Sequence, residues 1–404
     1  MSLVVNSKIL NDCFTVFLSG SVDSSNAMQM ESEISRACEG TSFSSLELDL
    51  KDLKYISSAG LRVVLKLAKL YNHFEVVNAS NEVFEIFDVT GFTSIVKVSK
   101  KLRTVSVEGC EMIGRGANGM VYRLDNDTII KVYASSTPKD VIREEREYAQ
   151  RAFLAGVPTA ISFDMVNVAD SYGIVFELVR ADTLAQRINS DQIRYEWYAN
   201  AYANLFKDIH KIEVKSNALP STKSIYHGLI DKMEKWYSLD GVATMHKLID
   251  IIPDRNTIVH NDFHTKNVML QGDELLLIDM AEISCGHPIF DLGASYFVHK
   301  QTAENKPHLV PRFLGVDADT ALNLWDIMVK VHFNTKDDEK VAYYNNLVKR
   351  MCFIKMALMP VLYFAADEDE RQSFVDIGKN EVIAKADEVA AAIKELVEIV
   401  DKTL

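Results

Sequence analysis

The spacing of apolar residues changes twice along this 404-residue chain, and these changes constrain the fold more than any other feature. Up to about residue 100, strands with period-two alternation, such as SLELDL at 45–50, alternate with amphipathic helices, such as AGLRVVLKLAKLY at 59–71. Strand-like segments predominate from about 108 to 180, and helical spacing predominates from about 190 onward. We therefore expect a small α/β domain, then a strand-rich lobe and a helix-rich lobe.

Composition and charge narrow the classes of partner. The 48% hydrophobic and 25% charged residues are typical of globular domains. A net charge of -13 argues against nucleic acid or an anionic membrane as a partner, because phosphate-rich surfaces require clustered Lys and Arg. A nucleotide remains compatible, because it needs only a few local cations and backbone N–H groups.

The sequence also predicts a soluble, cytoplasmic protein. The longest apolar run, residues 352–366, is interrupted by Lys355 and Pro360 and is shorter than the roughly 20 residues of a membrane span. The N-terminal residues contain no apolar signal-peptide segment. The five cysteines are scattered without a CxxC pair, which favours reduced thiols over a zinc site or a disulfide framework.

A glycine-rich segment lies between two expected strands. GRGANGMVY at 114–122 places Gly114, Gly116 and Gly119 in a GxGxxGxV pattern. Glycines allow the backbone to approach phosphate oxygens closely, although a simple hairpin turn gives the same pattern. A strand rather than a helix follows, so this is not the dinucleotide-binding fingerprint.

Lys131 is the single cation in the apolar strand TIIKVY. Burying an unpaired ammonium is costly, so Lys131 should either reach solvent or pair with an anion. The helix that follows offers three carboxylates, Glu144, Glu145 and Glu147. We expect Glu147 to be the partner, because it begins an apolar face that continues through Phe153 and Leu154.

The stretch VHNDFHTKNVML at 259–270 interrupts an apolar frame with polar residues, which is compatible with a metal site, a catalytic loop or a solvated turn. Its two histidines are four apart, but Asn261 lacks the carboxylate of an HExxH zinc helix. The next apolar strand, LLLID, ends in Asp279. Asn267 and Asp279 form an oxygen-rich pair suited to Mg2+, and Asp262 could accept the proton of an incoming hydroxyl.

The order of these features resembles the protein-kinase-like phosphotransferases, and more closely their aminoglycoside phosphotransferase and choline kinase branch. HNDFHTKN is similar to the HGDLHxxN motif of that branch, and IDMAEISCGHPIFDLG is similar to its ID(F/W)…DPxxDLA segment. The resemblance covers about residues 108–300. Asn261, Met280 and His287 depart from the usual Gly, Phe or Trp, and Asp, but none of these changes removes a catalytic atom. An active enzyme is therefore favoured over a pseudokinase.

The resemblance implies ATP and Mg2+ as cofactors and a role for each motif residue. Lys131 would contact the α and β phosphates and Glu147 would position it. Asp262 would be the catalytic base, with Asn267 and Asp279 as Mg2+ ligands. The backbone of the hinge, from Glu177 to Val179, would hold adenine, and Asp291 would brace the catalytic loop.

The acceptor is expected to be a small molecule with a hydroxyl group. Asp291 follows Asp279 by only 12 positions and no APE motif follows, so the peptide-binding activation segment of protein kinases is missing. The acidic run DEDE at 367–370 could attract a cationic acceptor, although such a run is more often a solvated helix end.

The N-terminal domain contains Ser57 and Ser58 between a strand and an amphipathic helix, where Ser58 could be the helix N-cap. LKDLKYISSAGL, together with FDVTGFTSI at 87–95, resembles the STAS domain of anti-sigma-factor antagonists. Ser58 falls on the serine that such antagonists have phosphorylated, and Ser57 replaces an Asp common there. The resemblance implies regulation through a protein partner or a ligand, with Ser58 as a candidate phosphosite.

We therefore expect an α/β STAS-like domain plus an α+β bilobal protein-kinase-like fold with a strand-rich N-lobe and a helical C-lobe. The expected boundaries are 1–98 for the STAS-like regulatory domain, 99–107 for a linker, 108–180 for the nucleotide-binding N-lobe and 181–404 for the C-lobe with the catalytic loop and acceptor site. The expected activity is transfer of the γ-phosphoryl group of ATP to a small hydroxylated acceptor. The alternatives are a partner-switching regulator, or a kinase that phosphorylates Ser58 of itself or of a related STAS protein.

Overall fold

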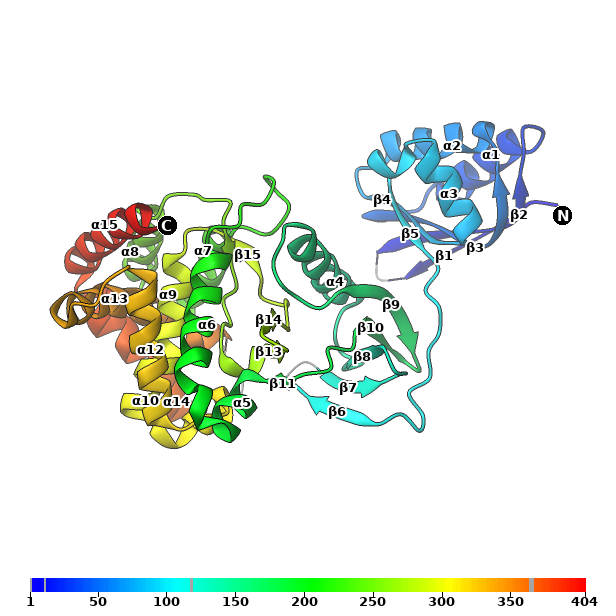
Figure 1. Ribbon diagram of the computed structural model, residues 1–404. Helices are drawn as coiled ribbons and strands as arrows, with labels where there is room; N and C mark the ends of the chain where they lie inside the picture. Colours follow the sequence, from blue (N-terminus) through cyan, green and yellow to red (C-terminus); the bar gives the residue numbers. More distant parts are fainter. Residues whose placement is uncertain (1, 11, 117–118, 363–366) are drawn as a thin grey trace. The chain divides into compact units, whose positions relative to one another are not determined.

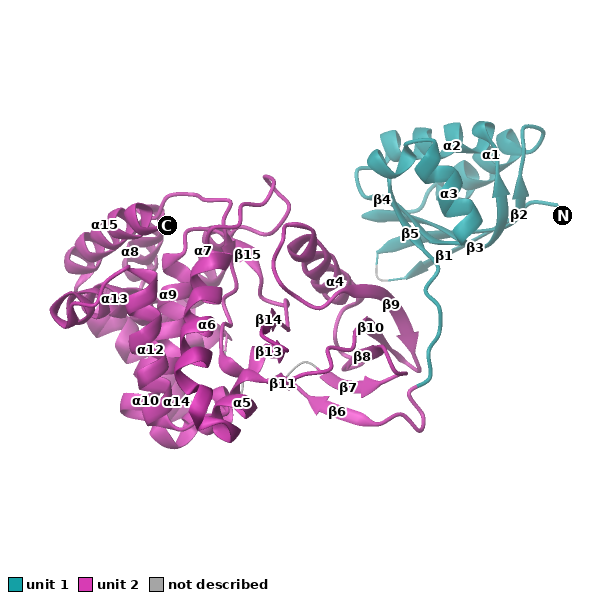
Figure 2. Ribbon diagram, viewed as in Figure 1, with its two compact units in different colours: residues 1–106 teal, residues 107–404 magenta. Residues whose placement is uncertain are grey.

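The computed structural model describes residues 2–404 except 11, 117–118 and 363–366. It divides into two compact units, residues 1–106 and 107–404 (Figure 2). In the described part of the chain, no helix combines the length and the apolar character needed to cross a membrane.

The N-terminal unit is a mixed α/β domain whose described helices cover one face of a five-stranded sheet (Figure 1). The strand order is β1-β2-β3-β4-β5, with β1 antiparallel to β2 and the other neighbours parallel. Its elements are β1 (Val4–Leu10), β2 (Cys13–Val22), α1 (Ala27–Cys38), β3 (Ser45–Ile56), α2 (Ser58–Leu70), β4 (Phe74–Ala79), α3 (Asn81–Val89), the 3₁₀ helix η1 (Phe92–Ser94) and β5 (Lys97–Lys100).

Alternation along the strands explains this layered packing. Phe14, Val16 and Leu18 of β2 are buried, whereas Phe17 between them is exposed. The helices bury their apolar faces against the same side of the sheet, as Val64 of α2 does. The α/β fold expected for the first hundred residues is confirmed.

The C-terminal unit begins with an antiparallel sheet in the strand order β6-β7-β8-β10-β9. One helix, α4, connects β8 to β9 and contacts β9 and β10 (Figure 1). The elements of this N-lobe are β6 (Met112–Arg115), β7 (Gly119–Arg123), β8 (Thr128–Tyr133), α4 (Lys139–Leu154), β9 (Ser162–Val168) and β10 (Ser171–Glu177).

The remainder of this unit is a helical lobe that also contains a three-stranded sheet in the order β11-β13-β14 and the strand pair β12-β15 (Figure 1). Its helices are α5 (Leu184–Ser190), α6 (Tyr195–Ile209), α7 (Thr222–Asp231), α8 (Leu239–Asp250), α9 (Ile289–Tyr296), α10 (Thr302–Asn305), α11 (Val310–Leu314), α12 (Ala318–His332), α13 (Asp338–Leu362), α14 (Glu368–Ile377) and α15 (Ala386–Thr403). Its strands are β11 (Asp182–Thr183), β12 (Ile258–Val259), β13 (Val268–Gln271), β14 (Glu274–Leu277) and β15 (Ser284–Cys285). Its 3₁₀ helices are η2 (Gln192–Arg194), η3 (Lys232–Lys235), η4 (Thr265–Asn267) and η6 (Pro307–Leu309), and its π-helices are η5 (Phe297–Gln301) and η7 (Gly378–Ile383). A strand-rich lobe is therefore followed by a helical lobe, which confirms the expected bilobal fold class.

Candidate active site

The polar stretch after β12 forms a tight loop that leads into η4 and β13. Asn261 has a φ of 64°, in the left-handed region that Gly and Asn adopt most readily. Its side-chain amide donates to the carbonyl oxygen of Glu282 at 2.9 Å and to Ser284 Oγ at 2.8 Å. Asn261 therefore meets the backbone requirement of a position where the resembling family commonly has Gly.

Asp291, in the first turn of α9, holds this loop in place. Its two carboxylate oxygens accept the backbone N–H groups of His260 at 2.7 Å and Asn261 at 2.6 Å. His210 Nε2 lies 3.0 Å from the same carboxylate, and both side chains are fully buried. Burial acts to raise the pKa of Asp291, but His210 and these contacts outweigh it and the pKa is lowered. The expected bracing role of Asp291 is confirmed.

Asp262 lies in the centre of the loop. Its Oδ2 accepts the amide of Asn267 at 3.0 Å and lies 3.5 Å from His264 Nε2. Its backbone N–H donates to His260 Nδ1 at 3.3 Å, so both histidines brace the loop as expected. Burial acts to raise the pKa of Asp262, but the contacts with His264, His260 and Asn267 lower it overall. With 44% of its side chain exposed, Asp262 is an ionised carboxylate that an incoming molecule can reach.

Asn267 and Asp279 lie next to each other because the N–H of Ile278 donates to the carbonyl oxygen of Asn267 at 2.8 Å. The Asn267 amide nitrogen is used by Asp262, which leaves the amide oxygen for another contact. Asp279 has a φ of 64° and a side chain that is 44% exposed. One amide oxygen and one carboxylate are the kinds of oxygen ligand that would suit Mg2+. No group of three or more His, Cys, Asp or Glu side chains among the described residues could hold a metal ion by itself.

Lys131 of β8 connects the two lobes. Its Nζ lies 2.8 Å from Glu145 Oε1 and 3.2 Å from Asp279 Oδ1. Only 13% of the Lys131 side chain and 8% of the Glu145 side chain are exposed. Burial acts to lower the pKa of Lys131, but Asp279 and Glu145 raise it overall, so the ammonium stays charged.

The prediction that Glu147 would pair with Lys131 is wrong. The buried residues of α4 follow helical spacing through Ile142, Glu145 and Ala149, so Glu145 lies on the inward face. Glu147, two residues later, points to another side and pairs with Arg151 at 2.9 Å. The misleading signal was Leu154, an apolar residue that is in fact 76% exposed.

The glycine-rich segment joins β6 to β7 beside the strand of Lys131. A Cβ on Gly119 would lie 2.2 Å from the carbonyl oxygen of Val132, so only Gly fits there. Gly114 makes ordinary contacts with Val121, and the N–H of Gly116 donates to the carbonyl oxygen of Gly119 at 2.9 Å. Ala117 and Asn118 of the motif lie outside the described residues.

The hinge follows β10. The N–H of Glu177 donates to the carbonyl oxygen of Ile161 at 2.9 Å, and the N–H of Leu178 donates to that of Asp127 at 2.8 Å. Among the described residues, the N–H of Val179 has no such partner, so it remains available to a bound molecule.

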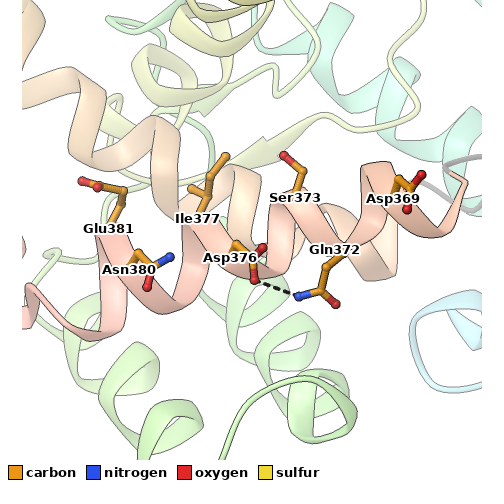
Figure 3. A pocket seen from close by; sticks show the side chains of 7 residues that line it. All are labelled: Asp369, Gln372, Ser373, Asp376, Ile377, Asn380 and Glu381. Atoms are coloured by element: carbon orange, nitrogen blue, oxygen red, sulfur yellow. Dashed lines mark hydrogen bonds between the residues drawn. The ribbon is translucent and has the colours of Figure 1, made fainter.

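The acidic run at 367–370 forms the first turn of α14. Asp367 caps the helix by accepting the N–H of Glu370 at 2.8 Å, and Glu370 pairs with Lys306 at 2.8 Å. This confirms a solvated helix end. An open depression of about 450 Å³ lies along α14 and η7, where the side chain of Gln372 donates to Asp376 (Figure 3).

Ser57 rather than Ser58 is the N-cap of α2, which corrects the expectation from the sequence. The hydroxyl of Ser57 accepts the N–H of Gly60 at 3.4 Å. Ser58 is the first helical residue and is exposed, so its hydroxyl is not used for capping.

Comparisons with known proteins agree with this architecture. The model of the phosphotransferase enzyme family matches residues 110–315, about half of the chain, and the STAS domain model matches residues 5–105. BtrV of Bordetella bronchiseptica, named as an anti-sigma factor antagonist, is 40% identical over 86 residues, which cover 20% of this chain and 73% of that protein.

Two solved structures are similar to about 70% of this chain. A choline/ethanolamine kinase family protein from Mesorhizobium loti is 14% identical with a TM-score of 0.45, covering 71% of this chain and 92% of that chain. The streptomycin–ATP–APH(2")-IIa complex is 16% identical with a TM-score of 0.42, covering 69% and 92%. From the family and domain matches, the chain belongs to the phosphotransferase enzyme family and carries an N-terminal STAS domain.

Proposed function

We propose that the C-terminal unit is an ATP- and Mg2+-dependent phosphotransferase that moves the γ-phosphoryl group to a hydroxyl of a small molecule. The observation that carries this proposal is a series of three contacts: Asp262 with Asn267, the backbone of Asn267 with that of Ile278, and the adjacent Asp279 with Lys131. These residues come from distant parts of the sequence, yet they lie together at the junction of the two lobes.

The N-lobe residues would hold the nucleotide. The Lys131 ammonium, fixed by Glu145, would contact the α and β phosphates. The segment containing Gly114, Gly116 and Gly119 would let the backbone approach the phosphate oxygens closely. In the hinge between Glu177 and Val179, the N–H of Val179 would donate a hydrogen bond to adenine.

Two oxygen donors would hold the metal. Asp279 through its carboxylate and Asn267 through its amide oxygen would bind Mg2+, which supplies positive charge against the phosphate oxygens. Lys131 lies 3.2 Å from the Asp279 carboxylate, so the same residue contacts both the ammonium and the proposed metal.

Asp262 would orient the acceptor and act as the base. Its carboxylate is ionised and reachable, and the Asn267 amide holds one of its oxygens. It would accept the hydroxyl proton as the acceptor oxygen attacks the γ-phosphorus in line with the bond to the leaving ADP oxygen.

The connection between Asp279 and α9 favours a small acceptor. It includes only the short strand β15, and its residues from Ile283 to Asp291 are buried. A buried connection of this length provides no exposed segment on which a peptide could lie.

Transfer of radiolabel from [γ-32P]ATP tests the proposal. Purified protein with Mg2+ should label members of a panel of hydroxylated small molecules. Asp262→Ala should abolish transfer but retain ATP binding, with exposed Asp376→Ala as the matched control. Full transfer by the Asp262 variant would refute the proposed mechanism.

A second candidate acceptor is a STAS serine. Ser58 is exposed, is not used for capping, and lies at a helix N-terminus where a phosphate is favoured. The similarity of this unit to an anti-sigma factor antagonist supports a partner-switching role. In the same assay, label on the protein that disappears in Ser58→Ala but not in Ser57→Ala would support this candidate. Unchanged labelling of the Ser58 variant would remove it.

A further inference from the structure

Lys355 lies on the face of α13 that packs against α9. Helix α13 packs closely on α9, because a Cβ on Gly293 would lie 2.8 Å from the Met351 side chain. Lys355 follows Met351 by one helical turn and therefore projects from the same face. Helix α9 also carries Asp291, which holds the loop around Asp262, so Lys355 lies on the face of α13 that packs on the helix bracing that loop.

Four titratable groups affect the charge of Lys355. Burial acts to lower the pKa of Lys355, but Tyr226 and the carboxylates of Glu282, Asp262 and Asp291 raise it overall. The ammonium is therefore charged at neutral pH and lies within electrostatic reach of the proposed base.

Lys355 nevertheless has no hydrogen bond or ion pair with any residue that the structure describes. Two other lysines of this unit with little exposure are satisfied: Lys131 by Glu145 at 2.8 Å, and Lys207 by Asn334 at 2.6 Å. A partly buried ammonium without an acceptor among the described residues keeps its three N–H groups for water or for a bound anion. An anion would also compensate the cost of its partial burial.

Glu282 does not form an ion pair or a hydrogen bond with the Lys355 ammonium. Their charges interact, but the two groups do not approach within ion-pair distance, so the ammonium hydrogens remain available. Glu282 is exposed and can be hydrated, whereas Lys355 is partly buried. The uncompensated group is therefore the cation, which favours an anionic ligand over a cationic one.

Building on the proposed function, we propose that Lys355 binds an anionic group of the acceptor, a carboxylate or a phosphate, beside the hydroxyl that faces Asp262. The acceptor would then be an anionic alcohol rather than the cationic amino alcohol or aminoglycoside that the acidic residues of the C-terminal lobe would favour. Lys355 would determine acceptor specificity and leave ATP binding unchanged.

Label transfer with acceptors matched in charge tests this inference. The panel combines hydroxy acids, hydroxyl amino acids and sugar phosphates with uncharged sugars, amino alcohols and aminoglycosides. We expect transfer to an anionic member, with carboxylates and phosphates as separate arms. Lys355→Met, which keeps the length but removes the charge, should raise the acceptor KM at least tenfold, with kcat and ATP affinity nearly unchanged. Lys355→Arg should restore part of the loss.

The matched control is Lys349→Met, which removes a cation from the same helix where it lies over the Phe353 ring. Preferred transfer to cationic or uncharged acceptors would refute the role of Lys355 and leave the phosphotransferase intact. An equal fall in kcat for every acceptor in Lys355→Met would also refute it, because Lys355 would then act on Asp262. Absence of ATP binding, or of transfer to every acceptor, would instead refute the proposed function and this inference with it.

Discussion

Replacing Glu145 by Gln removes the carboxylate that lies 2.8 Å from the Lys131 ammonium. Both side chains are almost fully buried, and removal of one partner of a buried pair typically costs about 3–5 kcal/mol. Lys131 keeps Asp279 at 3.2 Å, and Gln keeps an amide oxygen at the same place, so we expect a smaller loss of about 2 kcal/mol. If this loss appears in nucleotide binding, ATP affinity should fall roughly 30-fold.

Two measurements separate the contributions to that loss. Urea denaturation gives the change in the free energy of unfolding, and titration with ATP gives the change in affinity. The matched control is Glu147→Gln, because the Glu147–Arg151 pair is about 40% exposed and should contribute less than about 0.5 kcal/mol. An effect of Glu147→Gln on ATP affinity that equals or exceeds that of Glu145→Gln would show that our assignment of the Lys131 partner is wrong.

Two further predictions follow from the glycine segment and from the buried histidines. Gly119→Ala should strongly weaken ATP binding in a titration, because its Cβ would lie 2.2 Å from a backbone oxygen; Gly114→Ala, whose nearest contact is 3.6 Å, should bind almost normally, and equal losses would contradict the steric argument. Burial lowers the pKa of His299 to about 4 in the folded protein, below the roughly 6.5 of an unfolded chain. Its contribution to stability is therefore complete above about pH 6.5 and falls toward pH 4, by about 2 kcal/mol at pH 5, because the unfolded chain binds the extra proton. Urea denaturation at pH 7 and pH 5 should show a smaller pH difference in His299→Gln, and an unchanged difference would contradict this reasoning.

Local sequence patterns were sufficient to predict much of the fold and the loop around Asp262. The period-two strands and amphipathic helices of the first hundred residues form where expected, because burial of one face requires that spacing. The stretch around Asp262 forms a loop because the left-handed φ of 64° at Asn261 ends the extended conformation soon after the buried strand β12. Asp291 also has its expected contacts with that loop.

Contacts between residues far apart in the sequence could not be predicted from local sequence patterns. His210 contacts Asp291 across 81 positions, and no local pattern around His210 signals this contact. Lys355 was visible only as a charge that interrupts an apolar run, and its neighbours come from other helices and loops. For the capping of α2, Ser57 and Ser58 are chemically equivalent, so only the backbone geometry distinguishes them.

The sequence by itself determined the division into a STAS domain and a phosphotransferase unit, and the identity of the residues in the motif around Asp262. These depend on residue type and on spacing along the chain, which the sequence contains directly. Only the tertiary structure decided that Glu145 rather than Glu147 faces Lys131, and that Lys355 has no hydrogen-bond or ion-pair partner among the described residues. Both depend on the rotation of a helix about its axis, which is fixed by packing against segments far away in the sequence.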